Sequence, residues 1–312
     1  MEPHAWWPRR TEQVRALMTE SFTHGMGHMD RAQPRIAAAL RDILARPGSL
    51  ARSVTAYQLG LEMEMAEDAA RALACGIEYL HTASLVFDDL PAMDDARVRR
   101  GAACVHITHG ESIAMLAALA LVNRGFTMLW QGLHRADPTR RAKAGEWVDA
   151  RLGIHGVIGG QAHDLNGWRA EQNAADVSEV AARKTGDLLR LAVVLPAMLG
   201  RATEREIQLL DRLAVLRGLA YQAADDLKDV ISPVSASGKS CGRDADLGRP
   251  NLVAAEGLTA AMERFHRLRR TGDRVQAALP GPPERWGMLD LLRVPAPDAA
   301  MVPDLEWISA AV

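Results

Sequence analysis

Aromatic residues, cysteines and net charge are all scarce in this sequence of 312 residues. Phe, Trp and Tyr make up only 4% of it, whereas Ala, Leu, Met and Arg are abundant, and this balance favours helices over sheets. Cys75, Cys104 and Cys241 lie far apart without a C-x-x-C spacing, which indicates neither a zinc site nor a disulfide framework. The formal net charge of −2 gives no electrostatic reason to expect a nucleic-acid partner or an anionic membrane surface.

Long apolar runs and alternating patterns are missing as well. The longest uninterrupted apolar stretch, Ile113 to Val122, is too short to span a bilayer, so we expect a buried helix there and no transmembrane segment. The N-terminal residues lack the continuous apolar core of a signal peptide. A soluble, cytoplasmic protein is therefore expected, since a reducing compartment is the simplest setting for scattered cysteines. The lack of period-two segments and hairpin signals predicts no sheet.

Helical periodicity, in contrast, recurs along most of the chain. Ile36, Leu40, Ile43 and Leu44 share one helical face, and Pro and Gly residues separate this segment from the next ones. Hydrophobic residues make up 48% of the sequence, enough for a sizeable core. We predict an all-α, single-domain helical bundle over residues 1–312, with an N-terminal extension at 1–20 and a Pro-rich C-terminal tail at 281–312.

A cluster of acids follows an apolar run in the first half of the chain, and basic residues follow the acids. The acids are Asp88, Asp89, Asp94 and Asp95, and the basic residues are Arg97, Arg99 and Arg100. Crowded carboxylates repel one another unless cations occupy the site, and Mg²⁺ suits all-oxygen ligands. Arginines grip phosphate oxygens. A solvated helix end is the simpler interpretation, but acids at a helix C-terminus oppose the helix dipole, which favours a metal-bridged phosphate or diphosphate site.

A second acid cluster lies in the other half of the chain. Asp225 and Asp229 are four residues apart, so they project from one helix face. Downstream, the segment from Gly238 to Asp244 is a basic, turn-prone loop that includes Lys239 and can approach phosphate. It lacks the preceding strand and the spacing of a Walker A motif, which excludes a P-loop NTPase.

Six motifs in order resemble those of one family, the all-trans polyprenyl diphosphate synthases, which include farnesyl and geranylgeranyl diphosphate synthases. The matches run from about Gly48 to Asn251. They are the two aspartate-rich motifs Asp88–Asp95 and Asp225-Asp226-x-x-Asp229 (the latter preceded by Tyr221-Gln222), Arg99-Arg100-Gly101, Gly160–Leu165, Lys184-Thr185-Gly186, and Gly238-Lys239 with Asp244.

The resemblance implies an all-α bundle around a deep central cavity, usually a homodimer. It implies Asp88, Asp94 and Asp225 as ligands of three Mg²⁺ ions, with Asp89 and Asp229 supporting them. The allylic diphosphate would contact Arg99, Lys184, Gln222 and Lys239, with Gln161 and Thr185 also at the substrate. Asp88, Asp94, Asp225, Lys184 and Lys239 would be catalytic, because metal and basic groups stabilise the departing diphosphate. The double bond of isopentenyl diphosphate would then attack the allylic cation, and diphosphate would take the proton.

The sequence departs from the family where isopentenyl diphosphate should bind. The family has a Gly-Lys-Arg-x-Arg-Pro element, and the aligned stretch here runs from Gly48 to Ser53. Arg52 is retained, but Ser49 and Leu50 stand at the positions of the Lys and the first Arg. His81 and Arg100, the other expected contacts, are present. A charged hydrogen bond contributes about 1.5–3 kcal/mol, so the loss of two cations puts the use of isopentenyl diphosphate in doubt.

Product length is expected to depend on the helix that ends at the first motif. In the family, the side chains four and five positions before this motif form the floor of the cavity, and a bulky aromatic there stops growth at C15. Here these positions are the small residues Ser84 and Ala83. The floor would then drop by one turn, about 5.4 Å, to Tyr79 and Leu80, which favours C20 over C15. Alternatively, Ala83 only packs against another helix.

Two other functions stay open. The same fold could ionise an allylic diphosphate without isopentenyl diphosphate, as terpene synthases do, or the chain could be a regulatory subunit of a true synthase. Complete acid motifs argue against the regulatory subunit. A di-iron bundle is a poor interpretation, because Glu78-x-x-His81 has the required spacing but a second Glu-x-x-His is missing.

Overall fold

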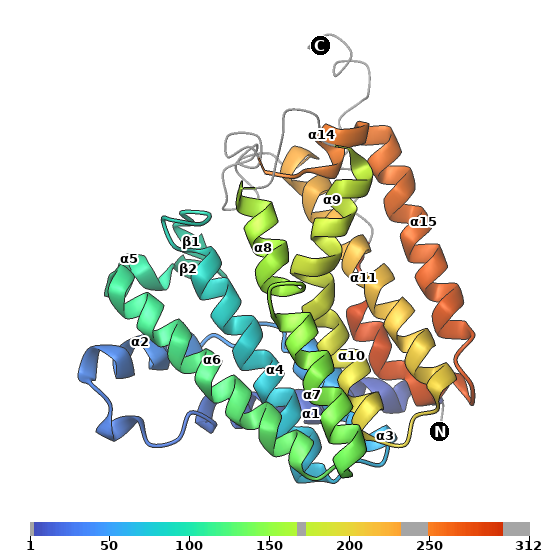
Figure 1. The fold of residues 1–312 in the computed structure, drawn as a ribbon, viewed down its shortest axis with the longest axis horizontal. Coiled ribbons are helices and arrows are strands. Elements are labelled where there is room, and N and C mark those ends of the chain that lie inside the picture. Colours follow the sequence, from blue (N-terminus) through green and yellow to red (C-terminus); the bar gives the residue numbers. More distant parts are fainter. Residues whose placement is uncertain (1–2, 167–172, 232–248, 296–312) are drawn as a thin grey trace.

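The computed structural model describes residues 3–166, 173–231 and 249–295, with side chains from residue 10 onward. Within these residues the chain is almost entirely helical, which confirms the predicted all-α class (Figure 1). Its α-helices are α1 (Pro3–His24), α2 (Pro34–Leu44), α3 (Ala51–Glu62), α4 (Glu67–Asp88), α5 (Val105–His109), α6 (Glu111–His134), α7 (Pro138–Leu152), α8 (Val157–Asn166), α9 (Ala174–Ala181), α10 (Asp187–Leu199), α11 (Glu204–Ile231), α14 (Leu252–Glu256) and α15 (Leu258–Ala277). Shorter elements are the 3₁₀ turns η1 (Met29–Arg31) and η3 (Pro283–Leu292) and the π-turn η2 (Ala182–Gly186).

Helix α4 is the centre of the first half of the bundle and packs against α6, α3, α1 and α10 (Figure 1). Its contact with α6 is close because glycines stand where the two helices cross. A Cβ atom added at Gly76 would lie 2.8 Å from the carbonyl oxygen of Gly125, and one added at Gly125 would lie 2.9 Å from Cγ of Leu80. This packing fixes the helix that carries Asp88 at its C-terminal end.

Helices α10, α11 and α15 form the second half, and η3 packs against α3 and α15. The structure differs here from the predicted tail at 281–312. Pro283 begins η3, and Trp286, Met288, Leu289 and Leu292 are buried in a core with residues of α3, α10 and α11. A proline at the first position of a turn is favourable, so the prolines here mark the start of an element. Residues 296–312 lie outside the described part.

The N-terminal segment also contributes to the core. Val14, Met18 and Phe22 of α1 are buried, and the Phe22 ring stacks on Tyr79 of α4 at a centroid distance of 5.0 Å. The hydroxyl of Tyr79 donates a hydrogen bond of 2.6 Å to the carbonyl oxygen of Phe22. From Val14 onward, the predicted extension at 1–20 is therefore part of the bundle.

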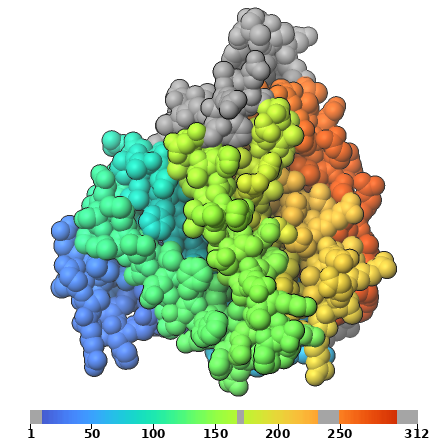
Figure 2. Space-filling model, in the orientation of Figure 1, coloured from blue at the N-terminus to red at the C-terminus, as the bar shows by residue number. Residues whose placement is uncertain are grey.

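Helix α6 is longer than the apolar stretch from which it was predicted. It has 24 residues, and by length and composition alone it could cross a membrane. One face is buried against α4, but the other carries exposed apolar side chains, so the predicted buried helix is buried on one side only. In the view of Figure 2, α6, α7 and α8 form much of the visible surface.

A small hairpin follows the first acid motif, although the sequence predicted no sheet. Strand β1 (Val98–Arg99) pairs with β2 (Ala102–Ala103) in antiparallel register, with Val98 opposite Ala103. Arg100 and Gly101 form the turn with φ angles of 53° and 75°. Both central residues have positive φ, as in the turns that join two-residue hairpins. Strands of two residues are too short to show alternation in the sequence.

Candidate active site

The first acid motif folds back onto the end of α4. The amide of Asp94 donates to the carbonyl oxygen of Asp88 at 2.9 Å, and the amide of Ala96 donates to that of Asp89 at 3.2 Å. These bonds satisfy carbonyl groups that the end of a helix leaves without partners. Pro91 stands three residues after the last residue of α4, where it lacks the amide donor that would continue the helix. The motif is therefore a compact loop at the C-terminus of α4, where the sequence predicted the helix to end.

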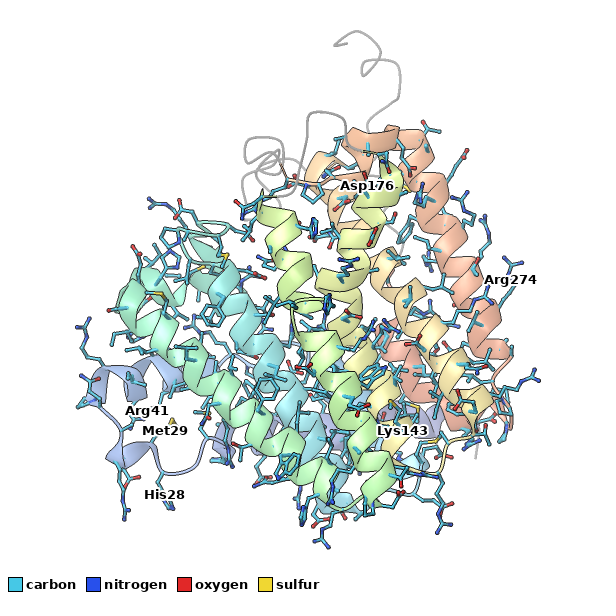
Figure 3. All side chains as sticks on the ribbon, in the orientation of Figure 1. His28, Met29, Arg41, Lys143, Asp176 and Arg274 are labelled. Atoms are coloured by element: carbon cyan, nitrogen blue, oxygen red, sulfur yellow. The ribbon has the colours of Figure 1, made fainter. Side chains whose placement is uncertain are left out.

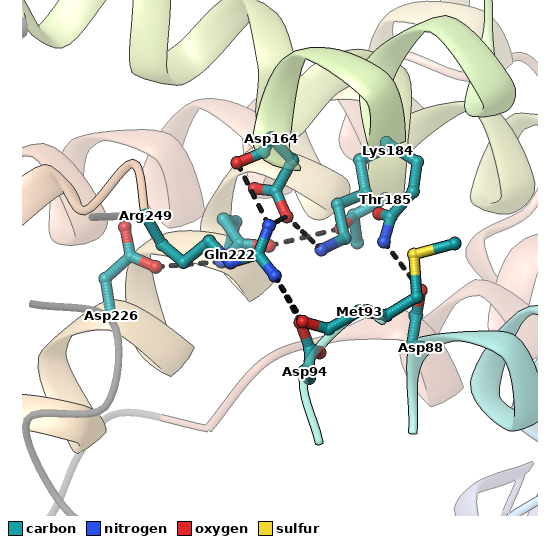
Figure 4. Close-up of polar contacts among 10 residues, drawn as sticks. Asp88, Met93, Asp94, Asp164, Lys184, Thr185, Gln222, Asp226 and Arg249 are labelled. Atoms are coloured by element: carbon teal, nitrogen blue, oxygen red, sulfur yellow. Dashed lines mark hydrogen bonds and ion pairs between the residues drawn. The ribbon is translucent and has the colours of Figure 1, made fainter. Parts of the chain in front are cut away.

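Asp88 lies in a crowded, mostly buried environment (Figure 4). Burial raises its pKa to about 6, the Lys184 ammonium counteracts this, and the nearby Asp94 and Asp164 carboxylates raise the pKa further. Gln161 of α8 donates a hydrogen bond of 2.9 Å from Nε2 to Oδ1 of Asp88. The structure thus brings together Asp88, Asp94, Gln161 and Lys184, as predicted.

Lys184 and Thr185 reach this site from a π-turn. Lys184 Nζ forms an ion pair of 2.5 Å with Oδ2 of Asp164. Although burial disfavours the ammonium, the Asp164 and Asp88 carboxylates outweigh it, and the pKa of Lys184 is raised. Wide π-turns often occur at functional sites because they change the direction of side chains within a helix. Gly218 of α11 allows the turn to pack closely on this helix, since a Cβ at Gly218 would lie 2.8 Å from Gly186 Cα.

A chain of hydrogen bonds connects the π-turn to the second acid motif. The Thr185 hydroxyl donates to Oε1 of Gln222 at 3.1 Å, and Gln222 Nε2 donates to Oδ1 of Asp226 at 2.8 Å. The other oxygen of Asp226 accepts from the amide of Leu252 at 2.8 Å. Gln222 and Thr185 were predicted at the substrate, and in the structure they also join η2 to α11. Asp226 is buried and supports the start of α14.

Arg249 is a residue of this site that the sequence analysis missed. Its guanidinium donates to the carbonyl oxygens of Met93 (2.8 Å) and Asp164 (3.2 Å) and to Oδ1 of Asp94 (3.1 Å), as Figure 4 shows. It therefore joins the first acid motif to α8. The only signal in the sequence is that Arg249 stands between Gly248 and Pro250, just after the basic loop.

Asp89 and Arg99 pair with each other. Nε of Arg99 donates to Oδ1 of Asp89 at 2.7 Å, and only 3% of Asp89 is exposed. Burial raises the pKa of Asp89, while Arg99 and its hydrogen bond lower it. The Asp89 carboxylate is thus turned toward the hairpin, which agrees with a supporting role rather than a direct one at a metal ion.

Asp225 and Asp229 lie on α11, with Asp225 exposed and Asp229 half-buried. In the described part of the chain, no three His, Cys, Asp or Glu side chains are close enough together to hold a metal ion as they stand. The donor set still fits Mg²⁺, because carboxylate oxygens are its preferred ligands. Burial raises the pKa of Asp88, and the nearby Asp94 and Asp164 carboxylates raise it further, so a cation here would be favourable. Lys239, predicted at the diphosphate, lies outside the described residues.

A cavity of about 440 Å³ lies between α3, α4, α11 and the residues after η3. Its lining includes Arg52, His81 and Arg100 on one side and Thr185 and Asp225 on the other. The residues predicted for isopentenyl diphosphate thus share one cavity with the second acid motif. Ala83 and Ser84 are not among its lining residues: Ala83 is fully buried, and the Ser84 hydroxyl donates to the His81 carbonyl oxygen at 2.8 Å.

Arg52 and His81 form a buried pair at this cavity. Nη1 of Arg52 lies 3.1 Å from Nε2 of His81. Burial and the Arg52, Arg100 and Arg99 guanidinium groups hold the pKa of His81 well below its usual value, so the neutral ring accepts this bond. Burial raises the pKa of Glu78, whereas Arg52 and hydrogen bonds with Ser53 lower it. Within the described residues, Nε of Arg52 and Nδ1 of His81 are buried without a hydrogen-bond partner.

The loop that departs from the family motif has one residue at the cavity and one in the core. Ser49 lines the cavity, but Leu50 is 2% exposed and packs in the core, with a φ of 53°. Gly48 makes room for Arg100, since a Cβ at Gly48 would lie 2.5 Å from its Cζ atom. Arg100 donates to the carbonyl oxygen of Arg46 at 2.8 Å.

The sequence profile of the polyprenyl synthetase family matches residues 33–277. The chain belongs to this family. It is 36% identical over 210 residues to geranylgeranyl pyrophosphate synthase 11 of Arabidopsis thaliana, covering 65% of this chain and 58% of the relative. It is 34% identical over 224 residues to farnesyl diphosphate synthase of Escherichia coli (strain K12), covering 71% and 75%. The match thus spans less than two thirds of the length of the Arabidopsis relative and three quarters of the length of the bacterial one.

Solved structures of the polyprenyl synthetase type share this fold. Geranylgeranyl pyrophosphate synthetase of Pyrococcus horikoshii superposes with a TM-score of 0.78 at 21% identity, covering 92% of this chain and 97% of that one. The geranyltransferase of Helicobacter pylori, solved with magnesium and isoprenyl diphosphate, gives a TM-score of 0.74 at 24% identity, with 90% and 96% covered.

Proposed function

We propose that this polyprenyl synthetase family member is a prenyltransferase that condenses an allylic diphosphate with isopentenyl diphosphate. One observation carries the proposal. The residues expected for isopentenyl diphosphate and the second acid motif line one cavity. The first motif is joined to α8 through Gln161 and Arg249, and Asp164 of α8 pairs with Lys184 next to the cavity residue Thr185. Two diphosphate substrates need this proximity, because the allylic carbon and the attacking double bond must meet in one enclosed site.

Asp88, Asp94 and Asp225 are the residues we expect to hold Mg²⁺, with Asp89 and Asp229 supporting them. Bound Mg²⁺ supplies positive charge that stabilises the leaving diphosphate. The protein's own cations act in the same direction. Lys184 is held between Asp164 and the first motif with a raised pKa, so it keeps its charge near the departing group. Three Mg²⁺ ions and a contact from Lys239 stay predictions.

The product assay tests this function directly. The protein is incubated with Mg²⁺ and dimethylallyl, geranyl or farnesyl diphosphate, with and without isopentenyl diphosphate, and the products are analysed by mass. A longer diphosphate formed only with isopentenyl diphosphate supports chain elongation. Products from the allylic substrate alone favour the terpene synthase alternative, and inactivity under all conditions contradicts both activities and leaves the regulatory subunit.

Product length is proposed to be C20. The support is that Ala83 and Ser84 are small and that Tyr79, one turn further toward the N-terminus of α4, is fixed by its contact with Phe22 and can serve as the floor. Ala83→Tyr should convert a C20 product into C15 in a folded, active protein. Because Ala83 is fully buried, a larger side chain can destabilise the core, so the thermal unfolding of the variant is measured as well. An unchanged C20 product from a folded variant would remove Ala83 from the cavity floor.

We also propose a homodimer formed through α6. Met115, Leu119, Phe126 and Trp130 share one face of this helix and are exposed, Trp130 to 60%. A contiguous apolar face of this kind on a folded chain is typical of a protein interface. Trp130→Glu should lower the molar mass measured by light scattering from two chains to one. Lys143→Glu, on exposed α7 (Figure 3), is the control for an added acid and should leave the mass unchanged.

A further inference from the structure

Two arginines that belong to none of the predicted motifs line the same 440 Å³ cavity as Arg52 and His81. Arg217 comes from α11, one residue before Gly218, and Arg293 follows η3. Both lie on the side of the cavity formed by the C-terminal half of the chain. The missing cations at Ser49 and Leu50 belong to the opposite side, at the start of α3.

Arg217 is almost completely buried and is tied to α15. Its exposure is 1%, and Nη2 donates to Oδ1 of Asp273 at 2.8 Å and to Oε1 of Gln276 at 3.2 Å. Burial lowers its pKa, although Asp273 raises it. Its Nε has no hydrogen-bond partner among the described residues. A buried donor without a partner is unfavourable, and this one lies beside α15, where a Cβ atom at Gly272 would be 3.6 Å from Nε. The argument for a ligand therefore rests on the place of Arg217 in the cavity lining.

The charges around the cavity indicate the sign of this ligand. Among the described residues, six cationic side chains line it, and Asp225 is the one carboxylate in this part of the lining. The six are Arg52, Arg99, Arg100, Arg217, Lys228 and Arg293. Arg293 is about half exposed and pairs with two acids, since its Nε lies 3.3 Å from an oxygen of Asp273 and of Asp290. Asp273 thus serves two arginines, so the cavity keeps an excess of positive charge that favours a multiply charged anion.

We propose that Arg217 and Arg293 bind the diphosphate of isopentenyl diphosphate and replace the Lys and Arg that Ser49 and Leu50 do not provide. This inference rests on the proposed condensation. Arg52, His81 and Arg100 contact the diphosphate from the α3 and α4 side, and Arg217 and Arg293 contact it from the α11 side. A guanidinium offers paired donors that match phosphate oxygens, so two of them can restore the lost contacts.

Three variants separate ligand binding from a structural role. Arg217→Met keeps an unbranched apolar side chain and removes the charge, and Arg293→Gln changes a half-exposed residue, where a substitution is expected to disturb the fold little. Asp273→Asn removes the partner of both arginines but keeps their charges. Arg274→Gln is the control, because Arg274 is exposed on the outer face of α15 (Figure 3). Binding of isopentenyl diphosphate alone is measured by calorimetry, and KM values of both substrates by product formation.

Arg217→Met and Arg293→Gln should each weaken isopentenyl diphosphate binding at least about tenfold and leave the KM of the allylic substrate within about twofold. Asp273→Asn should bind as tightly as wild type or more tightly, since it frees both guanidinium groups. If Arg217 only joins α11 to α15 through its ion pair with Asp273, Asp273→Asn and Arg217→Met will lower the melting temperature by similar amounts. Binding of isopentenyl diphosphate will then be unchanged, and this result overturns the inference.

The same measurements distinguish this inference from the proposed function. A wild-type protein that binds isopentenyl diphosphate through Arg217 and Arg293 but forms no longer product contradicts the condensation alone. A wild-type protein that elongates chains while Arg293→Gln binds normally contradicts the inference alone. If wild type shows no binding of isopentenyl diphosphate, the inference is wrong whatever the allylic substrate does.

Discussion

The two halves of the active site handle their charges in different ways. Around the first acid motif, cations meet acids of the protein: Lys184 pairs with Asp164 at 2.5 Å, and Arg249 with Asp94 at 3.1 Å. Around Arg52 and His81, buried nitrogen atoms lack partners in the described part of the chain. The first half is therefore held by the protein's own ion pairs, whereas the second half contains buried hydrogen-bonding groups without a partner among the described residues, which supports the proposed anion site.

The largest effect is expected from changing the aspartates that we propose as Mg²⁺ ligands. Asp88→Asn and Asp225→Asn should each lower turnover by at least about 10²-fold, because the leaving diphosphate loses the charge stabilisation that these ligands position. Mg²⁺ with inorganic diphosphate should raise the melting temperature of wild type and raise it much less in either variant. Equal stabilisation in all three proteins would contradict the assignment of these aspartates.

Introducing the Lys and Arg of the family motif at positions 49 and 50 should improve substrate binding at the first position and destabilise the protein at the second. Ser49 lines the cavity, so Ser49→Lys should lower the KM of isopentenyl diphosphate about tenfold by adding a charged contact. Leu50 is a core residue, so Leu50→Arg should lower the free energy of unfolding by more than about 3 kcal/mol by burying an unpaired charge. Denaturant titrations and steady-state kinetics check both. A stable Leu50→Arg protein with improved KM would place position 50 at the substrate.

Arg249→Gln tests whether the protein's own cation holds the first motif in place of a metal ion. Without the guanidinium, Asp94 is less neutralised, so Mg²⁺ measured alone should bind several-fold more tightly. The allylic diphosphate should bind several-fold more weakly, because a positive charge is lost. Calorimetry with each ligand separately gives both values. Changes in the same direction would mean that Arg249 acts only through the fold.

The smallest effect concerns His81, which lies in the half of the site with unpaired buried nitrogen atoms, and the dependence of protein stability on pH. The pKa of His81 lies well below 6.5 in the folded protein, so below about pH 6.5 the unfolded chain binds a proton there that the folded chain does not. His81 thus contributes stability above this pH that is lost as the pH falls, by up to about 1.4 kcal/mol per unit. Urea titrations between pH 7 and pH 5 should show a smaller loss for His81→Asn. Identical slopes would mean that His81 is protonated in the folded state.

Much of the site was predictable from the sequence because its motifs are local. The helix ending at Asp88 and the shared face of Asp225 and Asp229 follow from spacing and breakers alone. Arg217, Arg249 and Arg293 could not be found in this way, because each reaches the site through contacts with segments far away in the sequence. A lone arginine in a helix has no periodic signal that distinguishes a buried ion pair from a solvated one.

The fold was predicted in class but not at the chain's ends. Helical periodicity was enough to predict the bundle. The prolines near η3 indicated a tail instead of a helical element, and the strands of the Arg100-Gly101 hairpin are too short to show an alternating pattern. The π-turn at Lys184 was also invisible, since a one-residue insertion into a helix changes the direction of side chains without changing composition. In each case tertiary packing decided a local conformation that the sequence left open.

The contact between α3 and η3 has a consequence for the order in which the protein matures during synthesis. The hydroxyl of Thr55 donates to the carbonyl oxygen of Met288 at 3.3 Å, across 233 residues of chain. Chains grow at about 5–20 residues per second, so α3 leaves the ribosome at least about ten seconds before its partner. The first acid motif can pack against its neighbours in that interval. The cavity beside Arg52 can close only after Arg293, which lines it, has been synthesised, so the first acid motif can reach its packed state well before this cavity does.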